Sequence, residues 1–280
     1  MKLRFALNHR VAPRRSLSSL FDLAHDLGMS AVEIRNDLDD MPILDGTPAE
    51  TVKKAAAKRG VTILSINALQ RFNDWTPERA TQAAELTAYA AACAAKALVL
   101  CPVNDLSFTP KPSERLAGLR HALAALAPML RRHGLIGLVE PLGFVECSLR
   151  LKREAVEAID DSGTGDTFLL VHDTFHHHVA GESDIYPART GLVHVSGVAD
   201  PTVPTYAMRD PDRVLVTRDD RIDNIGQIGA LLDGGYDGPF SFEPFAESVS
   251  ELETAYHAVA ESRDIITGGL AARSAARSPS

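Results

Sequence analysis

The sequence predicts an α/β protein with a single (β/α)8 barrel, the TIM-barrel fold, and three observations support this prediction. Eight short apolar runs of strand type recur along the chain, and helical patterns lie between them. Strands that alternate with helices indicate a parallel sheet. The length of 280 residues suits one such barrel, which usually takes about 250 residues.

The apolar runs have the length of buried strands and are too short for buried helices. They begin near Leu3, Ala31, Val61, Ala97, Leu135, Thr167, Leu192 and Gly238. The main alternative is an open doubly wound sheet, which usually has a glycine-rich phosphate turn after its first strand. The first strand here is followed by Leu7-Asn8-His9-Arg10, without such a turn. We therefore favour the closed barrel.

Amphipathic or capped segments fill the intervals between the strands. A Thr-Pro pair opens two of them, at residues 47–48 and 76–77, and provides a cap with proline in the first turn. The predicted helices are Leu17–Leu27, a helix that opens at Thr47, Thr76–Ala95, Ser113–His133, Leu151–Ile159, a shortened Asp173–Ala180, Ile222–Leu232 and Ser250–Ile266.

No linker divides the chain, so we assign residues 1–271 to one barrel domain. Residues 197–221 form a long polar stretch without a helical pattern, which we interpret as the loop after the seventh strand. The segment Ala272–Ser280 is rich in Ser, Ala and Arg and predicts a disordered C-terminal tail.

Composition and charge argue against several classes of protein. The net charge of −8 offers no basic field for nucleic acid. No apolar run approaches the roughly 20 residues of a membrane span, and the N-terminus enters a strand without a signal peptide. The three cysteines lack CxxC spacing, as expected in a reducing compartment. We therefore expect a cytoplasmic protein, and the sequence leaves open whether it forms a homo-oligomer.

Three apolar runs end in a carboxylate, and a fourth contains a histidine. The carboxylates are Glu140, Asp173 and Glu243, and the histidine is His194. Taken singly, each carboxylate could accept hydrogen bonds from loop amides, and His194 could be a satisfied core histidine. Buried carboxylates are costly without a compensating charge, and barrel enzymes carry their sites at the C-terminal strand ends. Together the four side chains therefore indicate a divalent-metal site.

Further candidate pocket residues follow other strands at the same predicted rim. They are His9, Arg35, Asn67, Arg71, Pro102 and Asn104. Arg35 and Arg71 either form rim salt bridges or donate hydrogen bonds to a polyhydroxylated substrate. His176 is predicted to contact the substrate or a metal ligand, whereas His177 and His178 are predicted to be exposed helix residues.

With these residues placed, the sequence resembles the xylose-isomerase-like barrel superfamily of sugar isomerases and epimerases, which includes type IV AP endonucleases. Within it, the inosose (2-keto-myo-inositol) isomerases are the most similar. The likeness covers about residues 1–268 and rests on Val32-Glu33-Ile34-Arg35, Ile66-Asn67-Ala68-Leu69, Glu140, Asp173-Thr174-Phe175-His176, Val193-His194-Val195, Asp212-Arg213-Val214 and Ser241-Phe242-Glu243. The family's Pro-Gly-x-Gly turn after Arg-Val is missing, and Leu215–Asp220 stands in its place.

The resemblance implies that Glu140, Asp173, His194 and Glu243 bind one divalent ion, and that Glu140 and Glu243 form the acid–base pair. It also places Arg213, with His176, among the substrate-binding residues. The hard donor set favours Mn²⁺ or Mg²⁺ and allows Zn²⁺ or Co²⁺. The expected activity is isomerisation or epimerisation of a keto-polyol or sugar, by proton transfer between carbons next to a metal-bound carbonyl.

Two other functions stay open. An AP-endonuclease-like phosphodiester hydrolase would need more metal ligands than these strand ends provide, and the acidic charge disfavours DNA as a partner. A non-catalytic sugar-binding barrel would fit the missing Pro-Gly turn, although the complete ligand set argues against it.

Overall fold

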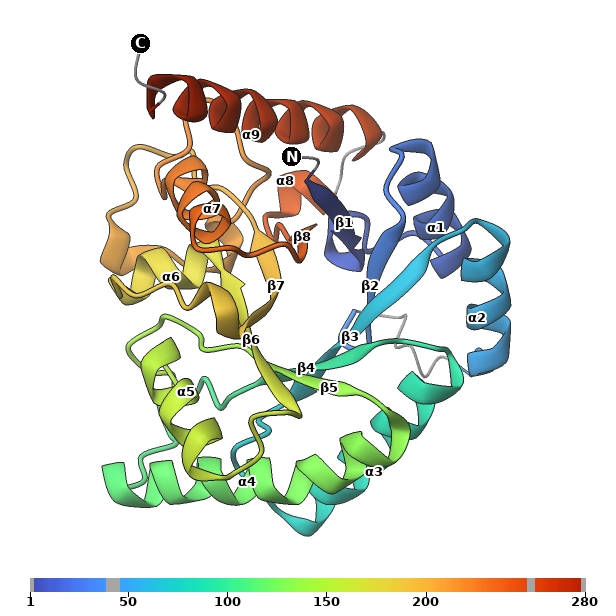
Figure 1. Cartoon of the computed structure of the whole chain (residues 1–280), viewed down its shortest axis with the longest axis vertical. Helices are drawn as coiled ribbons and strands as arrows, with labels where there is room; N and C mark the ends of the chain where they lie inside the picture. Colours follow the sequence, from blue (N-terminus) through green and yellow to red (C-terminus); the bar gives the residue numbers. More distant parts are fainter. Residues whose placement is uncertain (1–2, 39–45, 251–254, 278–280) are drawn as a thin grey trace.

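The structure is a computed structural model, and it describes residues 3–38, 46–250 and 255–277. Eight parallel strands close into one barrel in chain order, and the last strand pairs with the first (Figure 1). Helices surround the barrel, and long ones run along the top and the bottom of the view in Figure 1. The predicted single (β/α)8 barrel is therefore confirmed.

Each strand begins within two residues of its predicted start. The strands are β1 (Arg4–Asn8), β2 (Ala31–Arg35), β3 (Thr62–Gln70), β4 (Ala97–Cys101), β5 (Ile136–Val139), β6 (Phe168–Asp173), β7 (Thr190–Val195) and β8 (Pro239–Phe242). The strands read as unbroken apolar runs because parallel strands are covered on both faces. All five residues of β4, for example, are buried.

The helices follow the predicted order. They are α1 (Leu17–Asp26), α2 (Ala49–Lys58), α3 (Pro77–Ala92), α4 (Pro112–His133), α5 (Lys152–Asp161), α6 (Thr174–Ala180), α7 (Asn224–Asp233), α8 (Glu247–Ser250) and α9 (Ala255–Arg277), with short 3-10 turns η1 (His9–Val11), η2 (Pro187–Arg189), η3 (Thr205–Ala207) and η4 (Asp210–Asp212). Thr76 caps α3 as predicted, since its hydroxyl accepts a hydrogen bond from the Arg79 amide. No helix in the described part of the chain is both long and apolar enough to span a bilayer.

The C-terminal segment differs from the prediction. Residues 272–277 continue α9 and do not form the predicted disordered tail, while residues 278–280 lie outside the described part. Alanine and arginine are strong helix formers. In addition, Arg273 Nη2 donates to Asp233 Oδ2 at 2.6 Å, and Arg277 binds the same carboxylate at the end of α7.

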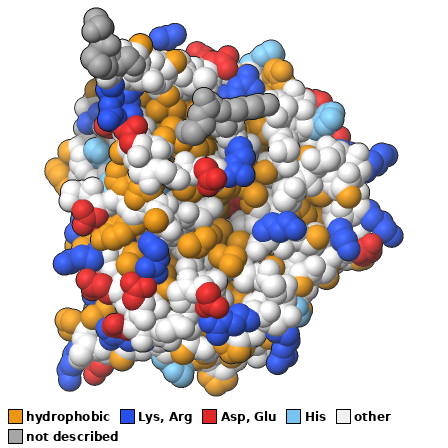
Figure 2. Space-filling view, in the orientation of Figure 1, with side chains coloured by type: hydrophobic (Ala, Val, Ile, Leu, Met, Phe, Trp, Pro, Cys, Tyr) orange, Lys and Arg blue, Asp and Glu red, His pale blue; other side chains and the backbone are white. Residues whose placement is uncertain are grey.

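The two ends of the barrel have different surfaces. Figure 2 shows apolar side chains gathered in the middle of the face in view, below α9. A groove of about 1210 Å³ at the N-terminal strand ends is lined by residues of β1, α7, α9 and the segment after α1. The polar residues of the candidate site lie at the opposite, C-terminal ends of the strands.

The loop after β7, predicted over residues 197–221, packs against neighbouring loops through its own apolar cluster. Val198 and Met208 of this loop, with Ile222 just after it, are buried against Phe144 and Phe175. This cluster joins the segments after β5, β6 and β7 above the barrel. It therefore supports the loops that surround the strand ends.

Candidate metal centre and substrate pocket

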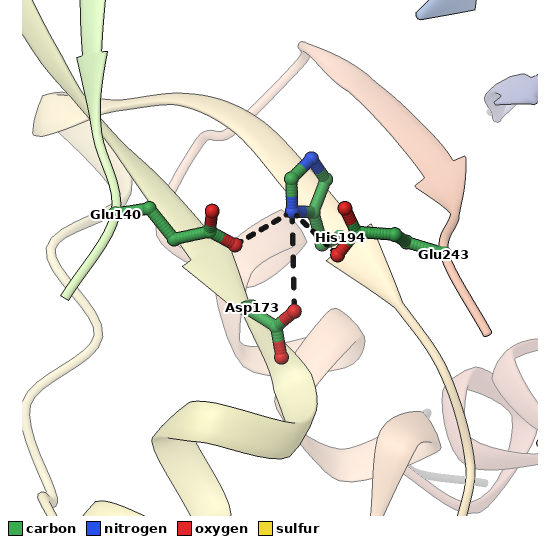
Figure 3. A group of neighbouring side chains, drawn as sticks. All are labelled: Glu140, Asp173, His194 and Glu243. Atoms are coloured by element: carbon green, nitrogen blue, oxygen red, sulfur yellow. Dashed lines mark hydrogen bonds and ion pairs between the residues drawn. The ribbon is translucent and has the colours of Figure 1, made fainter. Parts of the chain in front are cut away.

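The four residues predicted as metal ligands converge at the C-terminal end of the barrel. Glu140 directly follows β5, Asp173 ends β6, His194 lies in β7 and Glu243 directly follows β8. One ligand atom from each lies within 4.8 Å of those of the other three, and all four side chains are buried. They point toward one another in Figure 3. A barrel brings these positions together because its strand ends share one rim.

The imidazole of His194 presents Nδ1 to the three carboxylates. Nδ1 lies 2.8 Å from Glu140 Oε1, 3.1 Å from Glu243 Oε2 and 3.9 Å from Asp173 Oδ2 (Figure 3). Burial would lower the pKa of His194, but the neighbouring carboxylates, Glu243 foremost, outweigh it and raise the pKa well above 6.5. The three carboxylates therefore favour a positive charge in the space around Nδ1.

A fourth carboxylate, Glu33, lies on the other side of the His194 ring, and sequence reasoning assigned it no role. Its Oε2 lies 3.2 Å from His194 Nε2 and accepts a hydrogen bond from Ser65 Oγ at 2.6 Å. Burial alone would raise the pKa of Glu33, but the charge and hydrogen bond of His194 lower it. Glu33 therefore remains ionised and orients the ring so that Nδ1 faces the ligand carboxylates. The available signal was an acidic residue inside the apolar strand Ala31–Arg35.

Glu243 is bound by donors on both of its oxygens. Oε1 accepts hydrogen bonds from Arg35 Nη1 at 2.6 Å and from the side-chain amides of Asn8 and Asn67, each at 3.1 Å. Oε2 accepts one from Arg213 Nη2 at 3.0 Å. Although burial would raise its pKa, His194 and the two guanidinium groups lower the pKa of Glu243 well below 4.5.

Glu140 has a different environment from Glu243. Besides its contact with His194, the Glu140 carboxylate accepts a hydrogen bond from the thiol of Cys101, with Sγ 3.4 Å from Oε2. Among the described residues, no guanidinium group lies within hydrogen-bond or salt-bridge distance of Glu140. The two carboxylates predicted as an acid–base pair therefore differ in how strongly their anionic forms are stabilised by hydrogen bonds.

The charges of the buried side chains match a divalent cation. The ionisable side chains that are at most 4 % exposed in this cluster are Glu33, Arg35, Glu140, Asp173, His194, Arg213 and Glu243. With a neutral imidazole, four carboxylates and two guanidinium groups leave a charge of −2. One divalent ion would compensate that charge, and three carboxylates with one imidazole nitrogen form a suitable donor set. The residues present therefore fit such an ion.

A cavity of about 240 Å³ opens beside this cluster. Five of the predicted substrate-binding residues line it: Arg35, Asn67, Arg71, His176 and Arg213. His176 is buried, and its Nδ1 has no hydrogen-bond partner among the described residues. A buried polar atom without a partner is costly, so this nitrogen is a candidate contact for a ligand.

His9 directly follows β1, at the C-terminal strand ends as predicted. Its side chain is buried, but it is not among the residues that line the cavity. Its Nε2 lies 2.8 Å from the carbonyl oxygen of Arg15, and burial lowers its pKa to about 4. His9 therefore lies in the turn after β1 and is not among the residues that line the cavity, and its role in substrate binding stays a prediction.

The guanidinium groups at the cavity already have carboxylate partners. Arg35 binds Asp37 through two hydrogen bonds of 2.7 and 2.8 Å. Arg71 pairs with Asp105 at 3.1 Å and with Asp74 at 3.4 Å.

Arg213 has the same kind of partners, since it donates to Asp173 at 2.6 Å and to Asp210 at 3.2 Å. The ring of Phe245 lies against Arg213 and Arg35, with their Cζ atoms 4.4 and 5.4 Å from its centroid. Asp37 and Phe245 lie in loops and Asp210 begins the short turn η4, and they were missed because no hydrophobic period marks an inward-facing residue in such segments.

Known proteins resemble the chain over nearly its whole length. Residues 21–266 match the model of the xylose isomerase-like TIM barrel family. A xylose isomerase domain protein from Salmonella typhimurium LT2 is 33% identical, with a TM-score of 0.86 and coverage of 97% of this chain and 99% of that chain. No curated protein sequence gives a significant match.

Two more distant structures share the fold. The IolI protein with a bound zinc atom is 20% identical, with a TM-score of 0.84 and coverage of 96% of this chain and 99% of that chain. D-psicose 3-epimerase from Clostridium cellulolyticum H10, solved with D-tagatose, is 16% identical, with a TM-score of 0.73 and coverage of 96% and 99%.

Proposed function

Because this chain belongs to the xylose isomerase-like TIM barrel family, we propose that it is a divalent-metal-dependent isomerase or epimerase of uncharged keto-polyols or sugars, inososes included. The observation that carries the proposal is the convergence of Glu140, Asp173, His194 and Glu243 beside a small polar cavity. The zinc in IolI and the sugar in the Clostridium epimerase agree with this class of enzyme.

These four residues would hold the ion. The hard oxygen donors favour Mn²⁺ or Mg²⁺, while the imidazole also allows Zn²⁺ or Co²⁺. When bound, a divalent ion supplies Lewis-acid polarisation of a substrate carbonyl, which acidifies the proton on the neighbouring carbon. The remaining steps belong to the side chains of the protein.

Glu140 and Glu243 would transfer the proton. One carboxylate removes it from the carbon next to the carbonyl, and the electron pair of the C–H bond forms the C=C bond of an enediolate while the carbonyl oxygen takes the negative charge. Return of that proton to the former carbonyl carbon, with the proton of the neighbouring hydroxyl moving to the enolate oxygen, gives the isomer. Protonation of the first carbon from the opposite face by the second carboxylate, after it has taken up a proton from solvent, gives the epimer. Glu140 is the better initial base, because Glu243 is stabilised as an anion by Arg35, Arg213 and two amides.

The substrate is expected to be uncharged. Each guanidinium group that lines the cavity is already paired with carboxylates, so a phosphate or carboxylate on the substrate would have to compete with a carboxylate already bound there. Uncharged donors and acceptors such as Asn67, Gln70 and Asn104 also line the cavity. These groups suit the hydroxyls of a polyol, and His176 offers its unpaired nitrogen beside them.

The proposal is tested with a panel of ketoses and inososes, each paired with its phosphorylated form where one exists, in the presence of Mn²⁺. We expect turnover of at least one uncharged substrate and loss of that turnover after chelation, with recovery on adding the metal back. Turnover restricted to phosphorylated substrates would contradict the charge argument. Full activity of a verified metal-free protein would contradict the role of the ion.

A further inference from the structure

The three consecutive histidines of α6 point to three different surroundings. His176 lines the cavity, and His178 Nε2 lies 3.3 Å from Thr205 Oγ1 in the loop after β7. His177 Nδ1 lies 2.9 Å from Lys152 Nζ. His177 and His178 are partly buried, so the prediction that both are exposed helix residues was wrong. Helical spacing could not show this, because their partners come from α5 and from the loop after β7.

Lys152, the first residue of α5, has a buried side chain and lies between two imidazole rings. Its Nζ is 3.0 Å from His172 Nδ1 as well as 2.9 Å from His177 Nδ1. The nearby carboxylate of Glu182 binds the backbone amides of Lys152 and Arg153 at 2.9 and 3.0 Å. In the described part of the chain, no carboxylate lies within salt-bridge distance of Lys152 Nζ.

The hydrogen-bond pattern determines which atom of His172 carries its proton. Gln227 Nε2 donates to the carbonyl oxygens of Thr174 at 3.0 Å and Ile222 at 2.7 Å, so its Oε1 is the acceptor of the amide group. His172 Nε2, 2.9 Å from that oxygen, must therefore donate. Its Nδ1 is then free to accept a hydrogen bond from Lys152. One connected chain of hydrogen bonds thus joins α7, β6, α5 and α6.

Each of the two histidines that bind Lys152 is adjacent in the sequence to a residue of the candidate site. His172 directly precedes Asp173, and His177 directly follows His176. Side chains alternate along a strand, so His172 points to the outer face of the barrel while Asp173 points to the site. Lys152 therefore binds both ends of the β6–α6 turn from the side away from the cavity.

This turn also uses one oxygen of Asp173 to begin α6. Asp173 Oδ1 accepts hydrogen bonds from the amides of Phe175 at 2.8 Å and His176 at 2.9 Å. The other oxygen, Oδ2, faces Arg213 and His194. A movement of the turn would therefore shift the Asp173 carboxylate and the His176 ring together.

We propose that Lys152 is a positioning residue that holds Asp173 and His176 in the geometry the metal and substrate require, an inference that rests on the proposed function. It is not among the residues that line the site cavity. Its side chain binds His172 and His177, so it acts on the site through them. Burial of its amine costs stability, as shown by a pKa lowered to about 8, chiefly by desolvation. A buried lysine with this cost and without a salt bridge is expected to have a specific role.

The test compares Lys152→Met with Arg153→Met, a matched control on the next, exposed position of the same helix. His177→Ala is a milder second variant that removes one partner of Lys152, in case Lys152→Met does not fold. The measurements are hydrogen exchange of the Phe175 and His176 amides in metal-free protein, the Kd for Mn²⁺, and kcat and KM separately.

For Lys152→Met we expect faster exchange at both amides and Mn²⁺ affinity weakened about 10- to 100-fold, the usual effect of removing a group that orients metal ligands. His177→Ala should change both quantities in the same direction but less, and Arg153→Met should change neither. A lowered melting temperature with unchanged exchange and Mn²⁺ affinity would overturn the proposal, because a purely structural brace gives that result. If the unaltered protein binds no Mn²⁺, the proposed function fails, and amide exchange alone still decides whether Lys152 holds the turn.

Discussion

Glu33 Oε2 lies 3.2 Å from Nε2 of His194, on the side of the ring opposite the three candidate ligand carboxylates. Both side chains are fully buried. This pair links β2 to β7 across the barrel and determines which ring nitrogen faces the site. A carboxylate behind a metal-binding histidine orients the ring and makes its free nitrogen a better ligand.

Replacement of Glu33 by Gln should weaken Mn²⁺ binding about 10- to 100-fold, the range seen for such outer partners. The amide keeps the size of the side chain but removes its charge, so the ring loses its strongest hydrogen bond at Nε2. Isothermal titration with Mn²⁺ measures the effect, and exposed Glu50→Gln on α2 is the control. An unchanged affinity in a folded Glu33→Gln variant would show that the ring is held without this carboxylate.

The parts of the site that could be predicted are those for which a single segment of the sequence carries a recognisable pattern. Glu140, Asp173 and Glu243 each stand where an apolar strand ends, and a barrel brings strand ends together regardless of the details of its loops. The eight strands were predictable for a related reason, since parallel strands covered on both faces read as continuous apolar runs.

The parts that could not be predicted depend on partners distant in the chain. Glu33 and His194 are separated by 161 positions, and nothing in either segment shows that they meet. Lys152 occupies the first position of a helix, where a lysine is ordinarily exposed, and its burial depends on His172 and His177 from other elements. The end of α9 likewise depends on Asp233 at the end of α7.

Addition of Mn²⁺ to chelator-treated protein should raise the melting temperature by several degrees. Binding only to the native state contributes RT ln(1 + [L]/Kd), which is about 2.7 kcal/mol at a hundredfold excess over Kd. The three buried carboxylates that converge on His194 are the reason to expect native-state binding. Scanning calorimetry against metal concentration measures the shift. Asp173→Asn should reduce it, and equal melting temperatures with and without the metal would contradict the prediction.

The contribution of Lys152 to stability should increase as the pH rises from about 8 to 10.5. Its pKa is lowered from 10.5 to about 8 in the folded protein, so the unfolded chain binds more protons in this window and unfolding becomes less favourable with rising pH. The full difference corresponds to about 3 kcal/mol. The pKa values of His172 and His177 are lowered by burial, so neither imidazole titrates in this window.

The measurement is the free energy of unfolding of the unaltered protein minus that of Lys152→Met, at pH 7.5 and at pH 10. Taking the difference removes the contribution of groups that titrate in both proteins. The difference should shift in favour of the unaltered protein at the higher pH. A constant difference would mean that the amine of Lys152 keeps its ordinary pKa in the folded state.

The isomerisation should transfer hydrogen as a proton, so that the product formed in D₂O carries deuterium on the carbon next to the carbonyl. Glu243 lies on the opposite side of His194 Nδ1 from Glu140 in Figure 3. A carboxylate that has removed the proton from carbon can exchange that proton with solvent before returning it. Glu243→Gln keeps an oxygen near the metal but removes the basic group. It should lower kcat roughly 10²- to 10⁴-fold, the range for loss of a general base or acid.

Exposed Glu247→Gln, one turn beyond on α8, is the matched control and should leave kcat unchanged. Glu140→Gln should impair the first proton removal at least as strongly, since Glu140 has fewer donors that stabilise its anion. Deuterium in the product can be located by NMR. A fully active enzyme whose product contains no deuterium at that carbon would instead indicate an intramolecular hydride shift, and the two glutamates would then serve only to hold the metal.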